Sequence, residues 1–201
     1  MKKKIAIALS LVTVLSLVQL TFAQSKTPVK NTQNTQTTQT KQGAPAKPKE
    51  EVYYIKDKSG KDKAIKGTLT DITGEMLPMI NKLRERNGLS ELKASDNKQV
   101  IDFTKARSIE LAELFSHSRP YEGPKQATLV SLMSEENKIG AVGENIAAGY
   151  TTVEKAFIGW SNSKGHRENM LSKDFKKVSI YRFVASSKTE YGMYYIQVFT
   201  D

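Results

Sequence analysis

Apolar residues between residues 70 and 165 recur with the three-to-four-residue spacing of helices. In the first segment the apolar positions with this spacing are Met76, Leu77, Ile80 and Leu83. Gly88 follows them and supplies the left-handed residue that often ends a helix. Proline is tolerated in the first turn of a helix and not further in, so Pro78 predicts a start near Glu75.

A second helix is predicted through "DNKQVIDFTKARSIELAELF", residues 96–115, with Ser95 as its N-cap. The side chains expected to face inward are Val100, Phe103, Ala106 and Leu114. Pro120 disfavours helix at the residue before it, so the helix should end at "HSRP". A short third helix is expected from about Lys125 to Met133.

The next segment, "GAVGENIAAGY", is too rich in glycine to be a helix. Thr151 and Glu154 are three residues apart and match a capping box, which predicts another helix start. Its apolar stripe consists of Val153, Ala156, Phe157 and Trp160.

Strand patterns lie at the two ends of this helical region. "KVSIYRFVAS" and "YGMYYIQVFTD" predict two late strands joined by a polar turn. Residues 51–69 carry a weaker pattern around Ser59-Gly60, which indicates an N-terminal arm or a small hairpin. Helices first and strands late predict an α+β fold, with helices covering an antiparallel sheet.

The first 23 residues match a secretory signal peptide. Three lysines precede an apolar run that ends in Thr21-Phe22-Ala23, which predicts cleavage between Ala23 and Gln24. An uncleaved membrane anchor is the alternative, since residues 5–23 almost reach the length of a membrane span. The expected location is therefore extracellular, periplasmic or associated with the cell wall.

Residues 24–50 are rich in Thr, Gln, Lys and Pro and have few apolar side chains, so a disordered linker is expected. The formal net charge is +10, of which the signal peptide carries +3 and the linker +4. Residues 51–201 keep only +3. A basic linker can contact an anionic cell wall or membrane surface, or it can serve only as a soluble spacer. No nucleic-acid motif is present, and export argues against that partner.

The chain contains no cysteine, which excludes disulfides, thiol nucleophiles and cysteine-type zinc sites. It contains two histidines, and both lie in short polar runs: His117 in "FSHSRP" and His166 in "SKGHRENML". With the segment "GENIAAG", these runs resemble in order and spacing the CAP superfamily of cysteine-rich secretory, antigen 5 and pathogenesis-related 1 proteins. The resemblance covers residues 70–201 and is greatest to the cysteine-free bacterial SCP-like branch.

This resemblance implies an α-β-α sandwich with an open cavity in which two histidines meet acidic side chains. The matching positions are His117, His166 and Glu144. Family members often have a second glutamate three residues after a tryptophan, where this chain has Ser163. The resemblance therefore implies a site reduced by one carboxylate, with Ser163 in its place.

Two imidazoles and one carboxylate form a donor set that suits zinc and leaves a fourth position open. Zinc bound by His117, Glu144 and His166 is thus a candidate cofactor, and a zinc-bound water is a potential nucleophile. Without metal, a histidine beside a carboxylate is an acid–base pair. Each histidine, taken alone, is also compatible with a purely structural role.

Three functions remain open. The favoured hypothesis is a non-enzymatic binding module for a small molecule, a lipid or a partner protein. A metal-assisted hydrolase or lyase acting on an extracellular polymer or peptide is the alternative, although the chain lacks a serine nucleophile elbow and an HExxH motif. In the third hypothesis the basic linker positions the domain in the cell wall and the cavity has no function. No catalytic residue is assigned.

Overall fold

The computed structural model describes residues 4–7, 49–123, 128–134 and 136–201. The predicted cleavage site and all but the last two residues of the predicted linker lie outside this range. So does the start of the helix expected at Lys125; the described remainder of that segment holds only a short 3₁₀ helix, Val130–Leu132.

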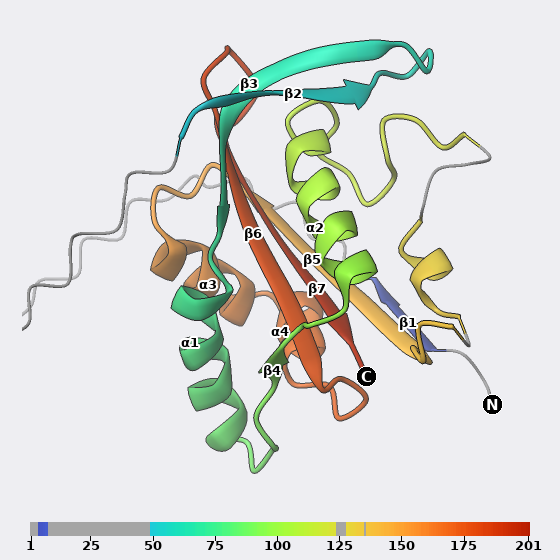
Figure 1. The fold of residues 1–201 in the computed structure, drawn as a ribbon. Helices are drawn as coiled ribbons and strands as arrows, with labels where there is room; N and C mark the ends of the chain where they lie inside the picture. Colours follow the sequence, from blue (N-terminus) through green and yellow to red (C-terminus); the bar gives the residue numbers. More distant parts are fainter. Residues whose placement is uncertain (1–3, 8–48, 124–127, 135) are drawn as a thin grey trace, which may run out of the picture. The chain divides into compact units, whose positions relative to one another are not determined.

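A seven-stranded mixed sheet forms the centre of the fold (Figure 1). Six strands follow the order β1-β5-β7-β6-β3-β2, and β4 pairs with β6. The strands are β1 (Lys4–Ile7), β2 (Glu51–Lys56), β3 (Asp62–Asp71), β4 (Lys93–Ala94), β5 (Ala141–Ala148), β6 (Lys177–Ala185) and β7 (Met193–Thr200). The pairs β1–β5 and β4–β6 are parallel and the others are antiparallel. The α+β prediction is therefore correct, although the sheet is not purely antiparallel.

The segment 51–69 belongs to this sheet. β2 and β3 form an antiparallel hairpin, and β3 continues along β6 from Gly67 opposite Ala185 to Asp71 opposite Tyr181. The Asp57 carboxylate accepts the backbone N–H groups of Ser59 and Lys61, which closes the turn. Strand β3 therefore continues through residue 70, where the family resemblance begins.

Helices cover both faces of the sheet. They are α1 (Thr73–Glu85), α2 (Lys98–Glu110), α3 (Val153–Asn162) and α4 (Lys164–Met170). Helix α2 packs in one apolar core with alternate strand residues such as Ile196 and Val198. Helices α1, α3 and α4 pack in a second core with the intervening residues Tyr195 and Phe199. Since neighbouring strand residues point to opposite faces, the two cores lie on opposite sides of the sheet, as the sandwich prediction requires.

Each predicted helix start moves by one or two residues. Helix α1 begins at Thr73, not Glu75, because Asp71 accepts the Thr73 N–H and the Thr73 hydroxyl bonds to the backbone of Ile180. Pro78 therefore lies in the second turn. The N-cap of α2 is Asn97 instead of Ser95, and its side chain accepts the N–H groups of Gln99 and Val100.

The other corrections concern α2 and α3. Helix α2 ends at Glu110, so Leu114 lies beyond it and is 37% exposed, contrary to the inward position predicted for it. Ala106 is only half-buried. Thr152, not Thr151, caps α3 by accepting the Lys155 N–H, so the predicted capping box does not form.

Candidate functional site

The "GENIAAG" segment forms most of β5, and this strand positions Glu144. Val142 and Ile146, two residues to either side, belong to the core under α2. Because side chains alternate along a strand, Glu144 also points toward α2. Its side chain is 2% exposed, so the carboxylate needs partners within the protein.

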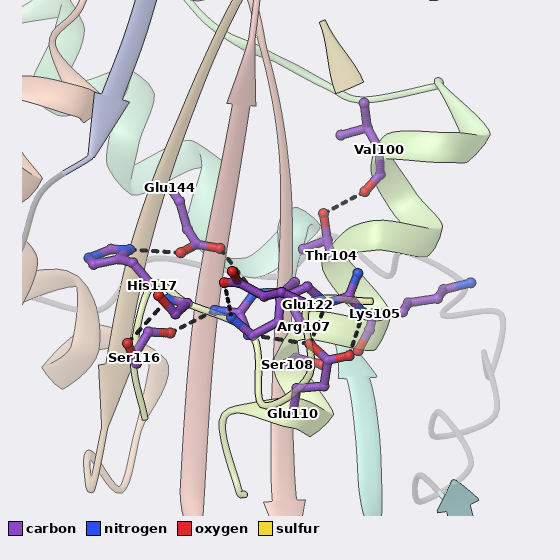
Figure 2. Close-up of polar contacts among 12 residues, drawn as sticks. Val100, Thr104, Lys105, Arg107, Ser108, Glu110, Ser116, His117, Glu122 and Glu144 are labelled. Carbon is purple, nitrogen blue, oxygen red and sulfur yellow. Dashed lines mark hydrogen bonds and ion pairs between the residues drawn. The ribbon is translucent and has the colours of Figure 1, made fainter. Parts of the chain in front are cut away.

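His117 is the first of these partners. It follows α2 in the "FSHSRP" segment, and its Nδ1 lies 2.7 Å from Oε1 of Glu144 (Figure 2). Its side chain is 11% exposed. A carboxylate at this distance favours the tautomer that carries the proton on Nδ1 and fixes the plane of the ring. In that tautomer Nε2 is the acceptor nitrogen of the ring.

Arg107 of α2 is the second partner of Glu144 and is fully buried. Its Nε lies 3.4 Å from Oε2 of Glu144, and its Nη1 lies 3.4 Å from Oε2 of Glu110. Its Nη2 donates to the backbone carbonyl of Ser116 at 2.7 Å (Figure 2). Arg107 therefore holds both the carboxylate that contacts His117 and the backbone just before His117.

Arg119 completes this cluster. It forms an ion pair with the buried Glu110, to which its Nε donates at 2.8 Å. Two carboxylates thus face two guanidinium groups, and the cluster is electrically neutral when His117 is neutral. Pairing and hydrogen bonding of this kind offset the desolvation penalty of the buried charges.

His166 lies in α4 with its side chain 3% exposed. Its backbone carbonyl accepts a hydrogen bond from Nδ2 of Asn145 at 3.0 Å. Asn169, one turn later, donates to the backbone carbonyl of Glu144 at 3.2 Å and to Oδ1 of Asn145 at 2.8 Å. Helix α4 is therefore anchored to β5 at Glu144 and Asn145. That the imidazole of His166 completes a cluster with His117 stays a prediction.

Ser163 ends α3 and precedes α4, where its carbonyl accepts the Arg167 N–H. The structure thus places it at the junction of these two helices. Its predicted position in a cavity stays a prediction.

The donor atoms fit a metal poorly in this arrangement. One oxygen of Glu144 contacts His117 and the other faces the cationic Arg107. Within the described ranges, no group of three or more histidine, cysteine, aspartate or glutamate side chains is arranged to hold a metal ion. Zinc at His117, Glu144 and His166 stays a prediction.

Aromatic side chains lie next to the His117 segment. The ring of Phe115, two residues before His117, packs edge-on against Tyr191 with a centroid distance of 5.3 Å. The rings of Tyr191 and Tyr194 of β7 also meet edge-on, with their centroids 6.2 Å apart. Gly149, just after β5, lies close to Tyr191: a Cβ added to Gly149 would be 3.8 Å from the Tyr191 ring. Tyr191 is 38% exposed, and a hydrogen bond to Glu190 and partial burial raise its pKa.

The sequence interpretation missed Arg107, Glu110 and the anchoring role of Asn169. Residues 107 and 110 continue the inward stripe that begins with Val100 and Phe103. A guanidinium and a carboxylate three residues apart on an inward stripe are a recognisable signal of a buried ion pair. For Asn169 no comparable signal exists, since its partners become neighbours only in the folded chain.

The sequence matches the CAP family model, described as the cysteine-rich secretory protein family, over residues 77–199. This is more than half of the chain, and the chain belongs to that family.

Two curated proteins of Bacillus subtilis (strain 168) are similar to it. The uncharacterized membrane protein YlbC is 29% identical over 139 residues, which is 67% of this chain and 39% of YlbC. The uncharacterized protein YkwD is 26% identical over 106 residues, or 53% of this chain and 40% of YkwD. The chain thus spans about two-fifths of the length of these relatives.

Solved structures are also similar. An outer surface protein of Borrelia burgdorferi superposes with a TM-score of 0.53 at 20% identity, covering 67% of this chain and 98% of that one. An extracellular protein with an SCP domain from Bacillus anthracis gives a TM-score of 0.49 at 27% identity, covering 63% and 39%. The first of these supports the fold and nothing more. In the part of the chain that the structure describes, no helix has the length and apolar content to cross a membrane.

Proposed function

We propose that this chain is an exported CAP-domain binding module that holds a small amphipathic ligand beside His117. The observation that carries the proposal is that one short segment supplies both Phe115, which packs against Tyr191, and His117, which contacts Glu144. Phe115 and the partly exposed Tyr191 supply apolar contact area. His117, two residues after Phe115 in the chain and oriented by Glu144, supplies one polar group. Ligand sites typically combine an apolar lining with a few oriented polar groups.

The ion pairs already present favour binding over metal chemistry. Arg107 already balances the charge of Glu144, so the cluster needs no cation to remain folded. A neutral ligand group that forms one hydrogen bond with His117 would leave these ion pairs intact.

Native mass spectrometry of the exported protein tests this proposal. It reports a bound ligand, a bound metal and the N-terminus in one measurement. We expect a chain that begins at Gln24 and carries a small molecule. The Tyr191→Ala and His117→Ala variants should lose that molecule, while Tyr54→Ala should retain it, because Tyr54 is an exposed tyrosine of the β2–β3 hairpin. Equal loss in all three variants contradicts the proposal.

Catalysis by the His117–Glu144 pair is the second candidate, favoured by their 2.7 Å contact. A histidine oriented by a carboxylate can act as a general base. Turnover of a cell-wall polymer or a peptide that is lost in His117→Ala and persists in EDTA would support catalysis without metal. Turnover lost in EDTA and in His166→Ala would support the metal-assisted hydrolase.

Zinc and the linker are tested separately. Equal zinc content in the wild type and in the His117→Ala/His166→Ala variant, measured by elemental analysis, would contradict zinc at these residues. The basic linker, residues 24–50, is proposed to contact an anionic cell wall or membrane. Deleting it should lower retention on anionic vesicles in a salt-dependent manner.

A further inference from the structure

Strand β1 occupies one edge of the sheet. Lys4–Ile7 pair in parallel with Ala141–Glu144 of β5, from Lys4 opposite Ala141 to Ile7 opposite Glu144. These four residues lie within the predicted signal peptide. If the signal peptide is removed, as the proposed function requires, the exported chain presents β5 as an edge strand.

The second half of this edge is already closed by side chains. Asn169 donates to the carbonyl of Glu144 at 3.2 Å, and the indole N–H of Trp160 donates to the carbonyl of Ile146 at 3.1 Å. These carbonyls therefore face away from β7. Backbone groups alternate in direction along a strand, so Val142 also turns its N–H and carbonyl toward the edge. The open section runs from Ala141 to the N–H of Glu144.

This section lacks the features that normally protect an edge. Natural edges carry exposed charges, proline or bulges that discourage pairing with another chain. Residues 141–143 are Ala, Val and Gly, and the one charged side chain of β5, Glu144, is buried against α2. The opposite edge, β2, carries Glu51 and Lys56, and Lys56 forms an ion pair with Asp62.

We propose that the exported protein binds an extended apolar segment of a partner protein at Ala141–Glu144, in parallel, by strand addition. Ala141 and Val142 belong to the cores on opposite faces of the sheet. An added strand would extend both cores, so its residues should be apolar in a continuous run and not alternately polar. The chain's own "IAI" at residues 5–7 is such a run and sits in this position. Main-chain hydrogen bonds supply the affinity in this mode of recognition.

The peptide KKKIAIALS, residues 2–10, is the probe, added to the chain purified from the culture medium. Amide hydrogen exchange is measured by NMR at Val142 and Glu144. We expect saturating peptide to slow exchange at both amides by about tenfold or more. Each N–H would then donate to a backbone carbonyl of the added strand instead of to water. Unchanged exchange overturns the proposal.

A matched pair of modified peptides controls for non-specific apolar binding. From the register, the N–H of Ala6 faces the Val142 carbonyl, and the N–H of Ile7 points away from β5. N-methylation at Ala6 should abolish protection, and N-methylation at Ile7 should preserve it. Equal behaviour of the two peptides contradicts strand addition.

Two further outcomes separate this proposal from others. The exported Tyr191→Ala variant should still respond to the peptide, so loss of the small ligand and loss of strand addition are distinguishable. An exported chain that retains residues 4–7 keeps its edge covered, and that result overturns the proposal. The edge could instead be covered by a second copy of this chain. A dimer in native mass spectrometry without peptide, with slow exchange at Val142 and Glu144, would overturn the proposal that the partner is another protein.

Discussion

Glu144 and Asn145 are consecutive residues of β5 that face opposite sides of the sheet and hold different parts of the candidate site. Glu144 accepts a contact from His117 on the side of α2. Asn145 donates to the backbone carbonyl of His166 on the side of α4. One residue pair on one strand therefore links both histidine segments, although they are 49 positions apart in the chain.

Replacing Arg107 with methionine should destabilise the protein strongly. The substitution keeps an unbranched apolar side chain but removes the guanidinium, so the buried carboxylates of Glu144 and Glu110 each lose a cationic partner. Removing one partner of a buried ion pair typically costs about 3–5 kcal/mol. Urea unfolding measures the loss in the free energy of unfolding. Lys98→Met on the same helix is the control and should change it little, because Lys98 is exposed.

The Arg107→Met/Glu144→Gln double variant sharpens this test. Removing the second charge as well should recover part of the loss, since no buried charge is then left unpaired at that position. A double variant that loses the sum of the two single effects would show that Arg107 and Glu144 are not coupled.

Asn169→Ala should loosen α4 from β5. The variant removes the donor to the Glu144 carbonyl and the donor to Oδ1 of Asn145, both buried. Leaving such groups without a partner costs about 1–3 kcal/mol. Thermal unfolding reports the loss, and the neighbouring exposed Glu168→Ala serves as the control. Hydrogen exchange should rise first at residues 164–170; a uniform rise over the chain would argue against a local anchor.

The helices and the last two strands could be predicted from the sequence because their apolar residues repeat with clear periods. Their starts were less predictable, since tertiary contacts decide them. Helix α1 gains its first turn from the bond between Thr73 and the backbone of Ile180, 107 residues away. Strand β5 has buried residues on both faces, and four of its eight residues are alanine or glycine, so it shows no apolar–polar alternation to recognise.

For the site, the family motifs pointed to the contact residues His117 and Glu144. The other two cluster residues of α2, Arg107 and Glu110, follow its helical period but were not recognised as part of the site. Arg107 and Glu110 lie on its inward stripe, where polar residues were not expected. The direction of each side chain could not be obtained from the sequence. Whether Glu144 faces α2 or α4 depends on the register of β5 against β7, in which Glu144 lies opposite Val198, 54 positions later in the chain.

Buried tyrosines should make the protein sensitive to alkali. Burial raises the pKa of Tyr181, and the charge and hydrogen bond of Asp71, its partner across β3 and β6, raise it further. Burial also raises the pKa of Tyr195. The pKa of each of these tyrosines is higher in the folded than in the unfolded chain, where it is about 10. Their contribution to the free energy of unfolding is therefore complete below pH 10 and falls as the pH rises beyond it.

The measurement is the free energy of unfolding in urea between pH 9 and pH 12. Tyr181→Phe removes the titrating group, so its curve should fall less steeply above pH 10 than that of the wild type. Tyr54→Phe, at a tyrosine that is 73% exposed, is the control. Parallel curves for the wild type and Tyr181→Phe would show that this tyrosine does not contribute to alkaline unfolding.

Two glycines near the junction of the hairpin and α1 should respond oppositely to alanine. A Cβ on Gly67 would lie 2.4 Å from the Val184 carbonyl oxygen and 2.4 Å from the Phe183 ring. A backbone atom cannot move aside without separating β3 from β6, so Gly67→Ala should cost at least about 1–3 kcal/mol. Gly74 lies in α1 with nothing within 4 Å of its added Cβ. Gly74→Ala should therefore stabilise the protein by about 0.5–1 kcal/mol, since alanine loses less backbone entropy in a helix. Thermal unfolding of both variants measures these changes in stability. A neutral Gly67→Ala variant would show that β3 does not pack against β6 in the described register. The hairpin would then be an arm separate from the sheet.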